Sequence, residues 1–329
     1  MSDEFTPADL IKMRTIKKTP MPINRLLAVT AVVIVVTFAS THSLLPPGAP
    51  GIAHAAAATL NFAVGPQYDS SHVYVAPEDL DRLVASVLAT FGGAASKQFT
   101  LTITPTPSST IWQAVSTPVG GMSVLGFKTP VPYPFGTERV GYLVTDMDAD
   151  IAAARAAGAD ILVTPFDDPV GRDAILQWPG GVNMQLYWHR IAPSNKPLQT
   201  IPENRVYVSA DRAAAFLDSF LAFSQGKVVS DDAHAPGIEI GRPSDTYRRI
   251  RVQSNFGKLT VLVTDGHLPY PYGRETTGYE VANLADTLAK AKAAGVTILG
   301  APYTADQRDA AVVQFPGGYI AEIHSPAGK

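Results

Sequence analysis

The sequence predicts an α+β fold made of four consecutive βαβββ modules behind an N-terminal leader, and three observations lead to that prediction. From about residue 60 onward the chain consists of two copies of one pattern. Within each copy, a short β-branched strand followed by an amphipathic helix occurs twice. Each helix is followed by apolar segments that lie between Pro, Gly and Ser turns, as is typical of strands.

Residues 1–57 are predicted to form a signal peptide or a membrane anchor with its linker. Four basic side chains precede an uncharged apolar run over residues 26–39, and the small residues Ala53-His54-Ala55 follow it. The basic residues are Arg14, Lys17, Lys18 and Arg25. We therefore expect an exported, periplasmic or secreted protein, with anchoring by residues 26–45 as the alternative. Met21 would begin a more ordinary signal.

Composition excludes several classes of function. The 329 residues carry 26 basic and 29 acidic side chains, a net charge of −3, so there is no large positive field to bind nucleic acid. Membrane contact is expected only through the N-terminal segment. No cysteine is present, which removes thiol nucleophiles and thiolate metal sites. With 46% hydrophobic residues the chain has ample material for a folded core.

The larger repeat defines the domains. Residues 131–144 (VPYPFGTERVGYLV) match residues 268–281 (LPYPYGRETTGYEV), so that Pro132 and Pro269 are 137 residues apart. Residues 177–181 match residues 314–318 at the same separation. We therefore predict one domain over residues 58–191, a polar linker over residues 192–202, and a second domain over residues 203–329.

The first copy contains the elements of two modules. A strand at Val73–Val75 precedes a helix that Pro77 opens and Gly92-Gly93 ends. The helix places its apolar side chains on one stripe: Leu80, Leu83, Val84, Val87, Leu88 and Phe91. Further strands are predicted at 97–104, 111–116 and 122–127, then at 140–144, 161–165, 174–178 and 183–188. The second module's helix begins after Asp146 and ends at Gly158.

The second copy repeats both modules. Strands are predicted to begin at Arg205–Val208 and Gly278–Val281, and the last one ends at Glu322-Ile323-His324. The first helix carries Phe216, Leu217, Phe220 and Leu221 and ends at Gly226, and the second runs from the cap Asn283 to Gly295.

These motifs, in this order and repeated twice, resemble the vicinal oxygen chelate superfamily of glyoxalases, bleomycin-resistance proteins and extradiol dioxygenases. The resemblance covers residues 60–326 and rests on four segments: 141–148 (GYLVTDMD), 177–186 (QWPGGVNMQL), 278–284 (GYEVANL) and 316–323 (PGGYIAEI). It implies two tandem glyoxalase-like domains, each a half-open β-barrel built from two βαβββ modules. The concave face of such a barrel holds a divalent metal or a small organic ligand.

The resemblance also implies where metal ligands would lie, in the first strand of each module and the last strand of each domain. In the first domain these positions offer His72 or Ser70, Glu138 beside Arg139, and Gln185. In the second they offer Glu203 or Arg205, Glu275 beside Thr276, and Glu322. A divalent Zn, Fe, Mn or Ni ion is the cofactor that such ligands imply. Neither set is a His/His/Glu triad. In addition, the Arg and Thr side chains at some of these positions donate little to a cation.

Several side chains are candidates for catalysis or ligand binding. Glu322, Glu275 and Glu138 are the candidate catalytic carboxylates. The alternative for Glu138 and Glu275, which occur in both copies, is a structural role in a rigid Pro-rich crossover. His72 is either a ligand or a hydrogen-bonded core histidine. The candidate ligand-binding residues are Tyr133, Tyr270, Gln185, Trp188 and His267.

Two functions remain open at this point. One is metal-dependent lyase, isomerase or dioxygenase chemistry on a small organic molecule. The other is non-catalytic binding of a drug or metabolite, as in bleomycin-resistance proteins. Arg248, Arg249 and Arg251 lie on one strand of the second domain and indicate either solvated charge or an anion-binding wall. We expect the second domain's cleft to be the more acidic.

Overall fold

The structure is a computed structural model that describes residues 62–63, 67–193 and 196–328. The predicted leader, with its alternative anchor over residues 26–45, lies outside the described residues. Within these ranges no helix is long and apolar enough to cross a membrane.

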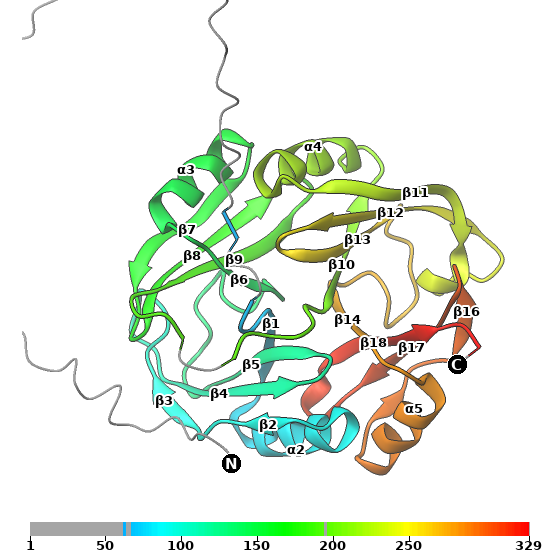
Figure 1. The fold of residues 1–329 in the computed structure, drawn as a ribbon, viewed down its shortest axis with the longest axis horizontal. Coiled ribbons are helices and arrows are strands. Elements are labelled where there is room, and N and C mark those ends of the chain that lie inside the picture. Colours follow the sequence, from blue (N-terminus) through cyan, green and yellow to red (C-terminus); the bar gives the residue numbers. More distant parts are fainter. Residues whose placement is uncertain (1–61, 64–66, 194–195, 329) are drawn as a thin grey trace, which may run out of the picture. The chain divides into compact units, whose positions relative to one another are not determined.

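The described chain contains four βαβββ modules in sequence order, as predicted (Figure 1). Module 1 consists of β1 (Ser71–Val75), α2 (Leu80–Phe91), β2 (Ala94–Ala95), β3 (Phe99–Leu101), β4 (Thr110–Thr117) and β5 (Gly120–Phe127). Module 2 consists of β6 (Gly141–Leu143), α3 (Met147–Ala156), β7 (Asp160–Asp167), β8 (Gly171–Trp178) and β9 (Val182–His189).

The second pair of modules repeats this order, which confirms the predicted fold class. Module 3 consists of β10 (Glu203–Ser209), α4 (Ala213–Ser224), β11 (Lys227–Pro236), the short helix η2 (Gly237–Ile240), β12 (Thr246–Ser254) and β13 (Gly257–Thr264). Module 4 consists of β14 (Thr276–Glu280), α5 (Leu284–Ala293), β15 (Thr297–Ile298), β16 (Tyr303–Ala305), β17 (Arg308–Gln314) and β18 (Ile320–Pro326). Two further short helices, η1 (Pro77–Asp79) and η3 (Pro316–Gly318), precede α2 and β18.

Local sequence explains where the helices start and stop. The side chain of Asp146 accepts hydrogen bonds from two backbone N–H groups in the first turn of α3, and the side chain of Asn283 accepts one, from Asp286 N, at the start of α5. Helix α2 ends at Gly92, whose φ of 77° suits a residue without Cβ. The apolar stripe predicted for α2 is buried, with Leu83 and Val87 fully covered.

Hydrogen bonding joins modules 1 and 2 into a first half and modules 3 and 4 into a second half. In every module the first strand pairs in parallel with the last, for example β1 with β5 and β10 with β13. Between modules 3 and 4, β10 pairs antiparallel with β14, so that Glu203 lies opposite Gly278. The first half has the equivalent contact at the bridge between Ser71 and Val140. Sequence alone had left open whether modules pair in this way or by swapping between domains.

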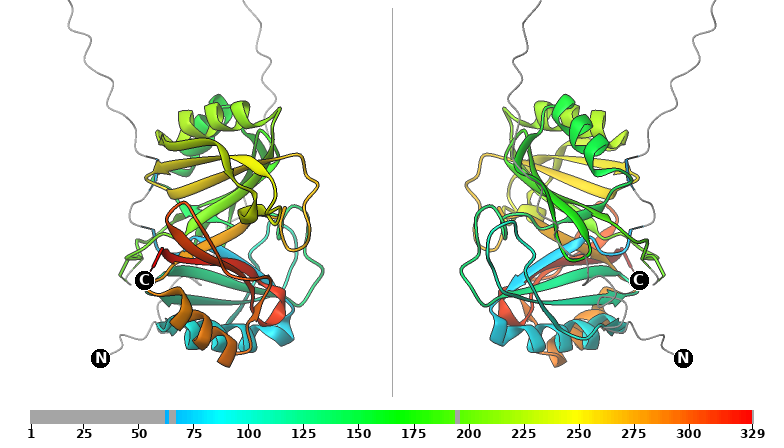
Figure 2. Two further views of the ribbon diagram at one scale, coloured as in Figure 1. Left: turned by 90° about the vertical axis from the view of Figure 1, so that its right-hand side faces the viewer. Right: turned by 90° about the vertical axis from the view of Figure 1, so that its left-hand side faces the viewer.

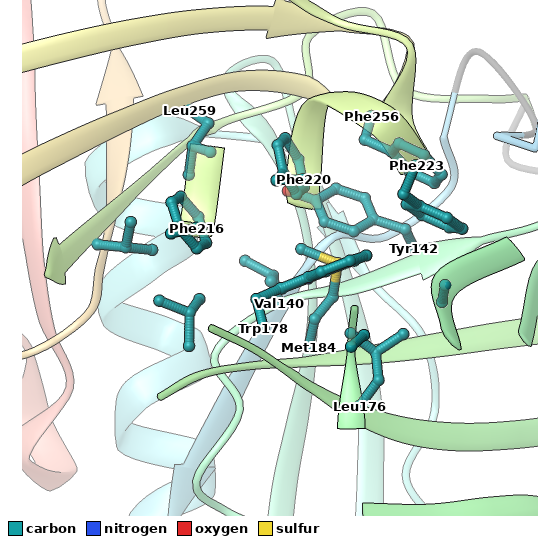
Figure 3. Packing of buried hydrophobic residues seen from close by; sticks show 14 of the residues in the cluster. Val140, Tyr142, Leu176, Trp178, Met184, Phe216, Phe220, Phe223, Phe256 and Leu259 are labelled. Carbon is teal, nitrogen blue, oxygen red and sulfur yellow. The ribbon is translucent and has the colours of Figure 1, made fainter. Parts of the chain in front are cut away.

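The apolar cores, in contrast, connect the two halves. One core combines module 2 with module 3, and Trp178 of β8 packs there against Phe220 and Phe223 of α4 (Figure 3). The other combines module 1 with module 4, where Phe91 of α2 contacts Phe315. Helices α3 and α4 accordingly lie at one end of the molecule and α2 and α5 at the other (Figure 2). Residues 61–329 form one compact unit.

Candidate functional site

Each half has a sheet face turned away from the helices, and polar side chains gather on these two faces. We call the face of the first half that carries His72, Ser123, Asp173, Gln185 and Tyr187 the first cup. The face of the second half that carries Glu203, Arg205, Arg249, Arg251, Glu322 and His324 is the second cup. Strand side chains alternate between faces, so the neighbours of these residues point into the cores: Val206 next to Arg205 is 1% exposed.

Strand register places a guanidinium between two carboxylates in the second cup. Glu203, Gly278 and Glu322 form one row across β10, β14 and β18. Arg205 is two residues along β10 on the same face, and its Nη1 lies 2.9 Å from Glu203 Oε1 and 3.4 Å from Glu322 Oε1. A Cβ on Gly278 would meet Glu322 Oε2 at 2.9 Å, so this glycine makes room for the pair.

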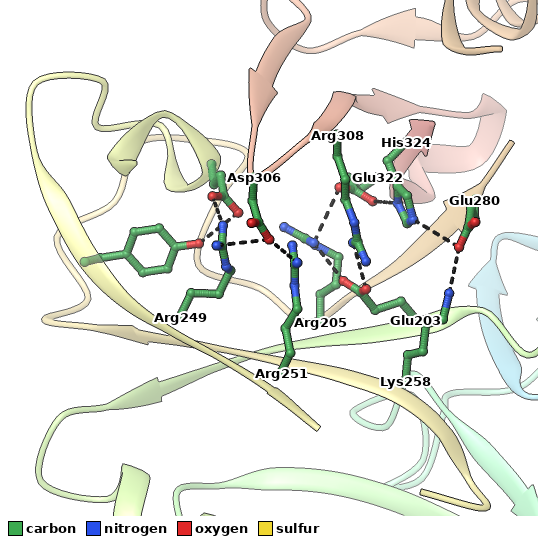
Figure 4. Close-up of polar contacts among 12 residues, drawn as sticks. Glu203, Arg205, Arg249, Arg251, Lys258, Glu280, Asp306, Arg308, Glu322 and His324 are labelled. Carbon is green, nitrogen blue, oxygen red and sulfur yellow. Dashed lines mark hydrogen bonds and ion pairs between the residues drawn. The ribbon is translucent and has the colours of Figure 1, made fainter. Parts of the chain in front are cut away.

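The ion pairs continue on both sides of Arg205 (Figure 4). Arg308 Nη1 donates to Glu203 Oε2 at 2.9 Å, and His324 Nδ1 lies 2.7 Å from Glu322 Oε2. Toward the other side, Arg249 pairs with Glu239 and with Asp306, while Arg251 also binds Asp306. Arg205, Arg249, Glu203 and Glu322 are each less than 5% exposed.

These charges stabilise one another electrostatically. Burial on its own would raise the pKa of Glu203, but Arg205 and Arg308 outweigh it and hold that pKa below its usual range. Burial likewise opposes the ionised form of Glu322, whose pKa is nevertheless lowered by Arg205 and His324. Each carboxylate of the second cup faces a guanidinium that balances its charge. The expectation that the second cleft has the more negative net charge is therefore not met.

The first cup is the more acidic of the two and contains aromatic side chains. Tyr187 Oη lies 2.7 Å from Asp69 Oδ1, and Ser123 donates to the other oxygen of that carboxylate. Trp112 Nε1 donates to Ser123 Oγ at 3.0 Å. Asp173 is 7% exposed, and burial, reinforced by the charge of Asp168, raises its pKa well above the usual value.

His72 and Glu138 form the centre of the first cup. His72 Nδ1 lies 3.6 Å from Glu138 Oε1, which also accepts a hydrogen bond from Tyr74 Oη. Glu138 has no exposed surface, and within the described part of the chain neither its Oε2 atom nor His72 Nδ1 has a hydrogen-bond partner. A Cβ on Gly141 would meet His72 Nε2 at 2.3 Å, so the imidazole covers this glycine. Buried polar atoms without partners are costly, which marks this pair as a place for a ligand atom or a water molecule.

The structure brings some of the predicted residues together and separates others. Glu203 and Glu322 meet in the second cup, and His72, Glu138 and Gln185 belong to the first. Glu275 lies instead beside Asn204, Arg139 and Glu138, where burial raises its pKa to about 8. Trp188 packs against the core shared by modules 2 and 3.

Three predicted ligand-binding residues lie at the surface. Tyr133 is 77% exposed, Tyr270 is 61% exposed, and the side chain of His267 is 90% exposed. Sequence reasoning did not identify Asp69, Asp173, Glu239 and Asp306 as site residues. The signal for Arg249 and Arg251 was present, because both alternate along β12 with the buried Ile250 and Val252.

Neither cup offers the donor set of a three-ligand metal centre. In the second cup a permanently charged guanidinium stands between the two carboxylates, which does not fit a divalent cation. In the first cup the position opposite Gln185 is Gly141, which has no side chain, and Gln185 hydrogen-bonds Asp173. Among the residues described, no three His, Cys, Asp or Glu side chains are grouped to hold a metal ion.

Comparison with known proteins identifies the fold. No protein-family model and no curated protein sequence matches the chain. A triple mutant of 4-hydroxymandelate synthase from Streptomyces coelicolor is similar in structure, with a TM-score of 0.54 and 13% identity over 80% of this chain and 94% of that one. This likeness confirms the vicinal oxygen chelate fold that the sequence resemblance implied.

Two further similar structures have lower scores. A fusion of a xylose isomerase-like TIM barrel with a 4-hydroxyphenylpyruvate dioxygenase has a TM-score of 0.49 and 14% identity, over 82% of this chain and 50% of that one. The Mn(II)-bound glyoxalase from Novosphingobium aromaticivorans has a TM-score of 0.47 and 13% identity, over 80% of this chain and 83% of that one.

Proposed function

We propose that the protein binds a small organic molecule in the first cup without using a metal ion. This proposal rests on which protein residues stand at and around the family's ligand positions in both halves. Arg205 lies between Glu203 and Glu322 in the second cup, and in the first cup Gln185 is hydrogen-bonded to Asp173 and lies opposite Gly141, which has no side chain. Metal-assisted chemistry of the family's type would need three protein donors around one ion.

The lining of the first cup supports binding of a ligand that has both an apolar ring and hydrogen-bonding groups. Trp112 and Tyr187 supply aromatic surface, and both are held by hydrogen bonds to the Asp69 network. The unpartnered atoms His72 Nδ1 and Glu138 Oε2 supply polar contacts that such a ligand would satisfy. Small-molecule sites typically combine an apolar lining with a few polar groups of this kind.

A second candidate is a metal-dependent lyase or dioxygenase activity confined to the first cup. The specific observation in its favour is the His72–Glu138 pair, because an imidazole nitrogen and a carboxylate oxygen without partners are both suitable donors for Zn, Fe, Mn or Ni. Gln185 would be the third ligand, after release from Asp173.

Metal analysis of the purified protein separates the two candidates. We expect no stoichiometric divalent ion in the wild-type protein after incubation with Zn²⁺, Mn²⁺ or Fe²⁺ and gel filtration. A stoichiometric ion that is lost in His72→Ala would replace the first proposal with the second. An ion that is lost in Glu322→Ala instead would contradict the reading of the second cup. Circular dichroism of each variant serves as the folding control.

We also propose that the protein acts outside the cytoplasm. The support is the order of basic residues, apolar run and small residues within residues 1–57. N-terminal sequencing of the protein recovered from its producing cells tests this, with a mature start shortly after Ala55 expected. An intact N-terminus in a membrane fraction would favour anchoring by residues 26–45.

A further inference from the structure

The second cup contains guanidinium groups whose hydrogen-bonding capacity is only partly used. Arg249 is 2% exposed, yet its Nε has no hydrogen-bond partner among the described residues, and the same holds for the buried Nε of Arg251. Burial, together with the charges of Arg308 and Arg249, lowers the pKa of Arg251. A cationic group that is crowded by other cations and left with a free donor favours the approach of an additional anion.

Asp306 is the anion that these arginines contact in the structure. Its Oδ2 lies 3.1 Å from Arg249 Nη2 and accepts a hydrogen bond from Arg251 Nη1 (Figure 4). Arg251 has no other carboxylate partner among the described ion pairs, so a single oxygen serves two guanidinium groups.

Asp306 reaches this position from the tip of a hairpin. It connects β16 to β17, and both turn residues are left-handed, with φ of 49° at Asp306 and 58° at Gln307. Its side chain is 35% exposed, whereas Glu203, Glu239 and Glu322 on the other side of the arginines are buried. Asp232, an exposed carboxylate 3.5 Å from Arg249 Nη2, has no ion pair with Arg251 among the described residues, so Asp306 is the carboxylate shared by both arginines that can leave the cluster without opening the sheet.

We propose that Arg249 and Arg251 form a binding site for a small organic carboxylate, and that Asp306 occupies this site as an internal competitor. An incoming carboxylate takes over the guanidinium contacts while the Asp306 side chain turns to solvent. The planar fork of a guanidinium matches a carboxylate in two-point geometry, and the free Nε atoms provide the second donors. Tyr247 and Tyr303, both buried within electrostatic reach of Arg205, supply ring surface beside the site.

This site is separate from the proposed ligand site of the first cup, and it does not require that proposal to hold. The two cups would then recognise different chemistry, because the first is acidic and the second presents free guanidinium donors.

Titration of the full-length protein with sodium benzoate at constant ionic strength tests the site. Asp306→Asn removes the competing charge and keeps a side chain that tolerates left-handed backbone. By isothermal titration calorimetry we expect this variant to bind benzoate about tenfold more tightly than the wild type, the effect of one charge-assisted contact. Adding Arg251→Gln to Asp306→Asn should abolish the gain.

Arg248, which lies on β12 like Arg249 and Arg251, provides a matched control through its ion pair with Asp231 of β11. Asp231→Asn removes the carboxylate partner of Arg248, an exposed pair 2.7 Å apart on the opposite face of β12, and should leave benzoate binding unchanged. Equal benzoate affinity in the wild type and Asp306→Asn would overturn the proposal. An equally large gain for sodium sulfate would overturn the assignment to carboxylates. The comparison of Asp306→Asn with the wild type remains decisive even where the double variant does not fold.

Discussion

At the scale of single residues, charge compensation dominates the second cup. Arg205 serves two buried carboxylates at once, so removal of its guanidinium leaves buried Glu203 with Arg308 alone and buried Glu322 with His324 alone. A buried charge without a partner costs far more than a pair contributes. The folded protein should therefore tolerate the loss of an exposed charge at the edge of this cluster, but not the loss of the buried Arg205 guanidinium at its centre.

Replacement of Arg205 by Met tests this asymmetry. We expect Arg205→Met to lower the free energy of unfolding by about 3–5 kcal/mol, because it strands buried charge. Lys258→Met is the matched control, since Lys258 pairs with Glu280 across 2.7 Å with both side chains almost half exposed. Exposed pairs contribute at most about 1 kcal/mol. Urea unfolding measures both, and similar losses for the two variants would contradict the argument.

Glu275 gives a residue-scale prediction about pH. Burial raises its pKa to about 8, so the folded protein keeps a proton that the unfolded chain, with a pKa of about 4.3, has released. Between these two values the free energy of unfolding falls as pH rises. Glu275→Gln resembles the protonated acid and should remove this fall, which makes the variant more stable relative to the wild type at pH 8 than at pH 5.

Urea unfolding at the two pH values provides the measurement. Glu280→Gln is the control, because the pKa of Glu280 is lowered by its hydrogen bond with Lys258 and its loss should give no advantage at pH 8. A wild-type stability that stays constant from pH 5 to pH 8 would show that Glu275 is ionised in the folded protein.

At the scale of elements, sequence predicted the helices and strands well and the polar contacts poorly. The stripe from Leu80 to Phe91 gave the bounds of α2, since helix periodicity is a local property. The strand that carries Arg248, Arg249 and Arg251 was recognisable too, but the sequence only indicated basic side chains on that strand. Asp306, the partner of Arg249 and Arg251, is 55 residues beyond Arg251, and no local pattern shows that the two meet.

The cap of α3 gives an element-scale prediction. The Asp146 side chain accepts from Asp148 N at 3.0 Å and Ala149 N at 3.1 Å, which satisfies two N–H groups that the helix itself leaves free. Asp146→Ala should cost about 1 kcal/mol of unfolding free energy. Asp148→Ala, two residues further along the same turn with a side chain 76% exposed, should cost only about half of that, about 0.5 kcal/mol. Thermal or urea unfolding distinguishes the two, and equal costs would argue against the cap.

At the scale of the whole molecule, the sequence repeat divides the chain between modules 2 and 3, whereas the apolar cores cross that boundary. Hydrogen bonds join modules 1 and 2, and modules 3 and 4, as the 137-residue repeat suggests. The cores join module 2 to 3 and module 1 to 4. Sequence could not reveal this, because the same apolar stripe on a helix fits a partner from either half.

Shared cores imply that the two halves unfold together. All three tryptophans, Trp112, Trp178 and Trp188, lie in the first half, and Trp178 and Trp188 pack in the core shared with module 3, so tryptophan fluorescence reports on the first half and on that core. Phe315 belongs to the second half, is 1% exposed and contacts Phe91 of the first half. Phe315→Ala should cost about 3–5 kcal/mol and shift the urea midpoint of tryptophan fluorescence as far as that of far-UV circular dichroism.

The exposed Val229→Ala is the control and should move neither midpoint, since a 54% exposed side chain buries little apolar surface. Independent halves would give a different result: the fluorescence midpoint would stay in place in Phe315→Ala while part of the circular dichroism change moved to lower urea.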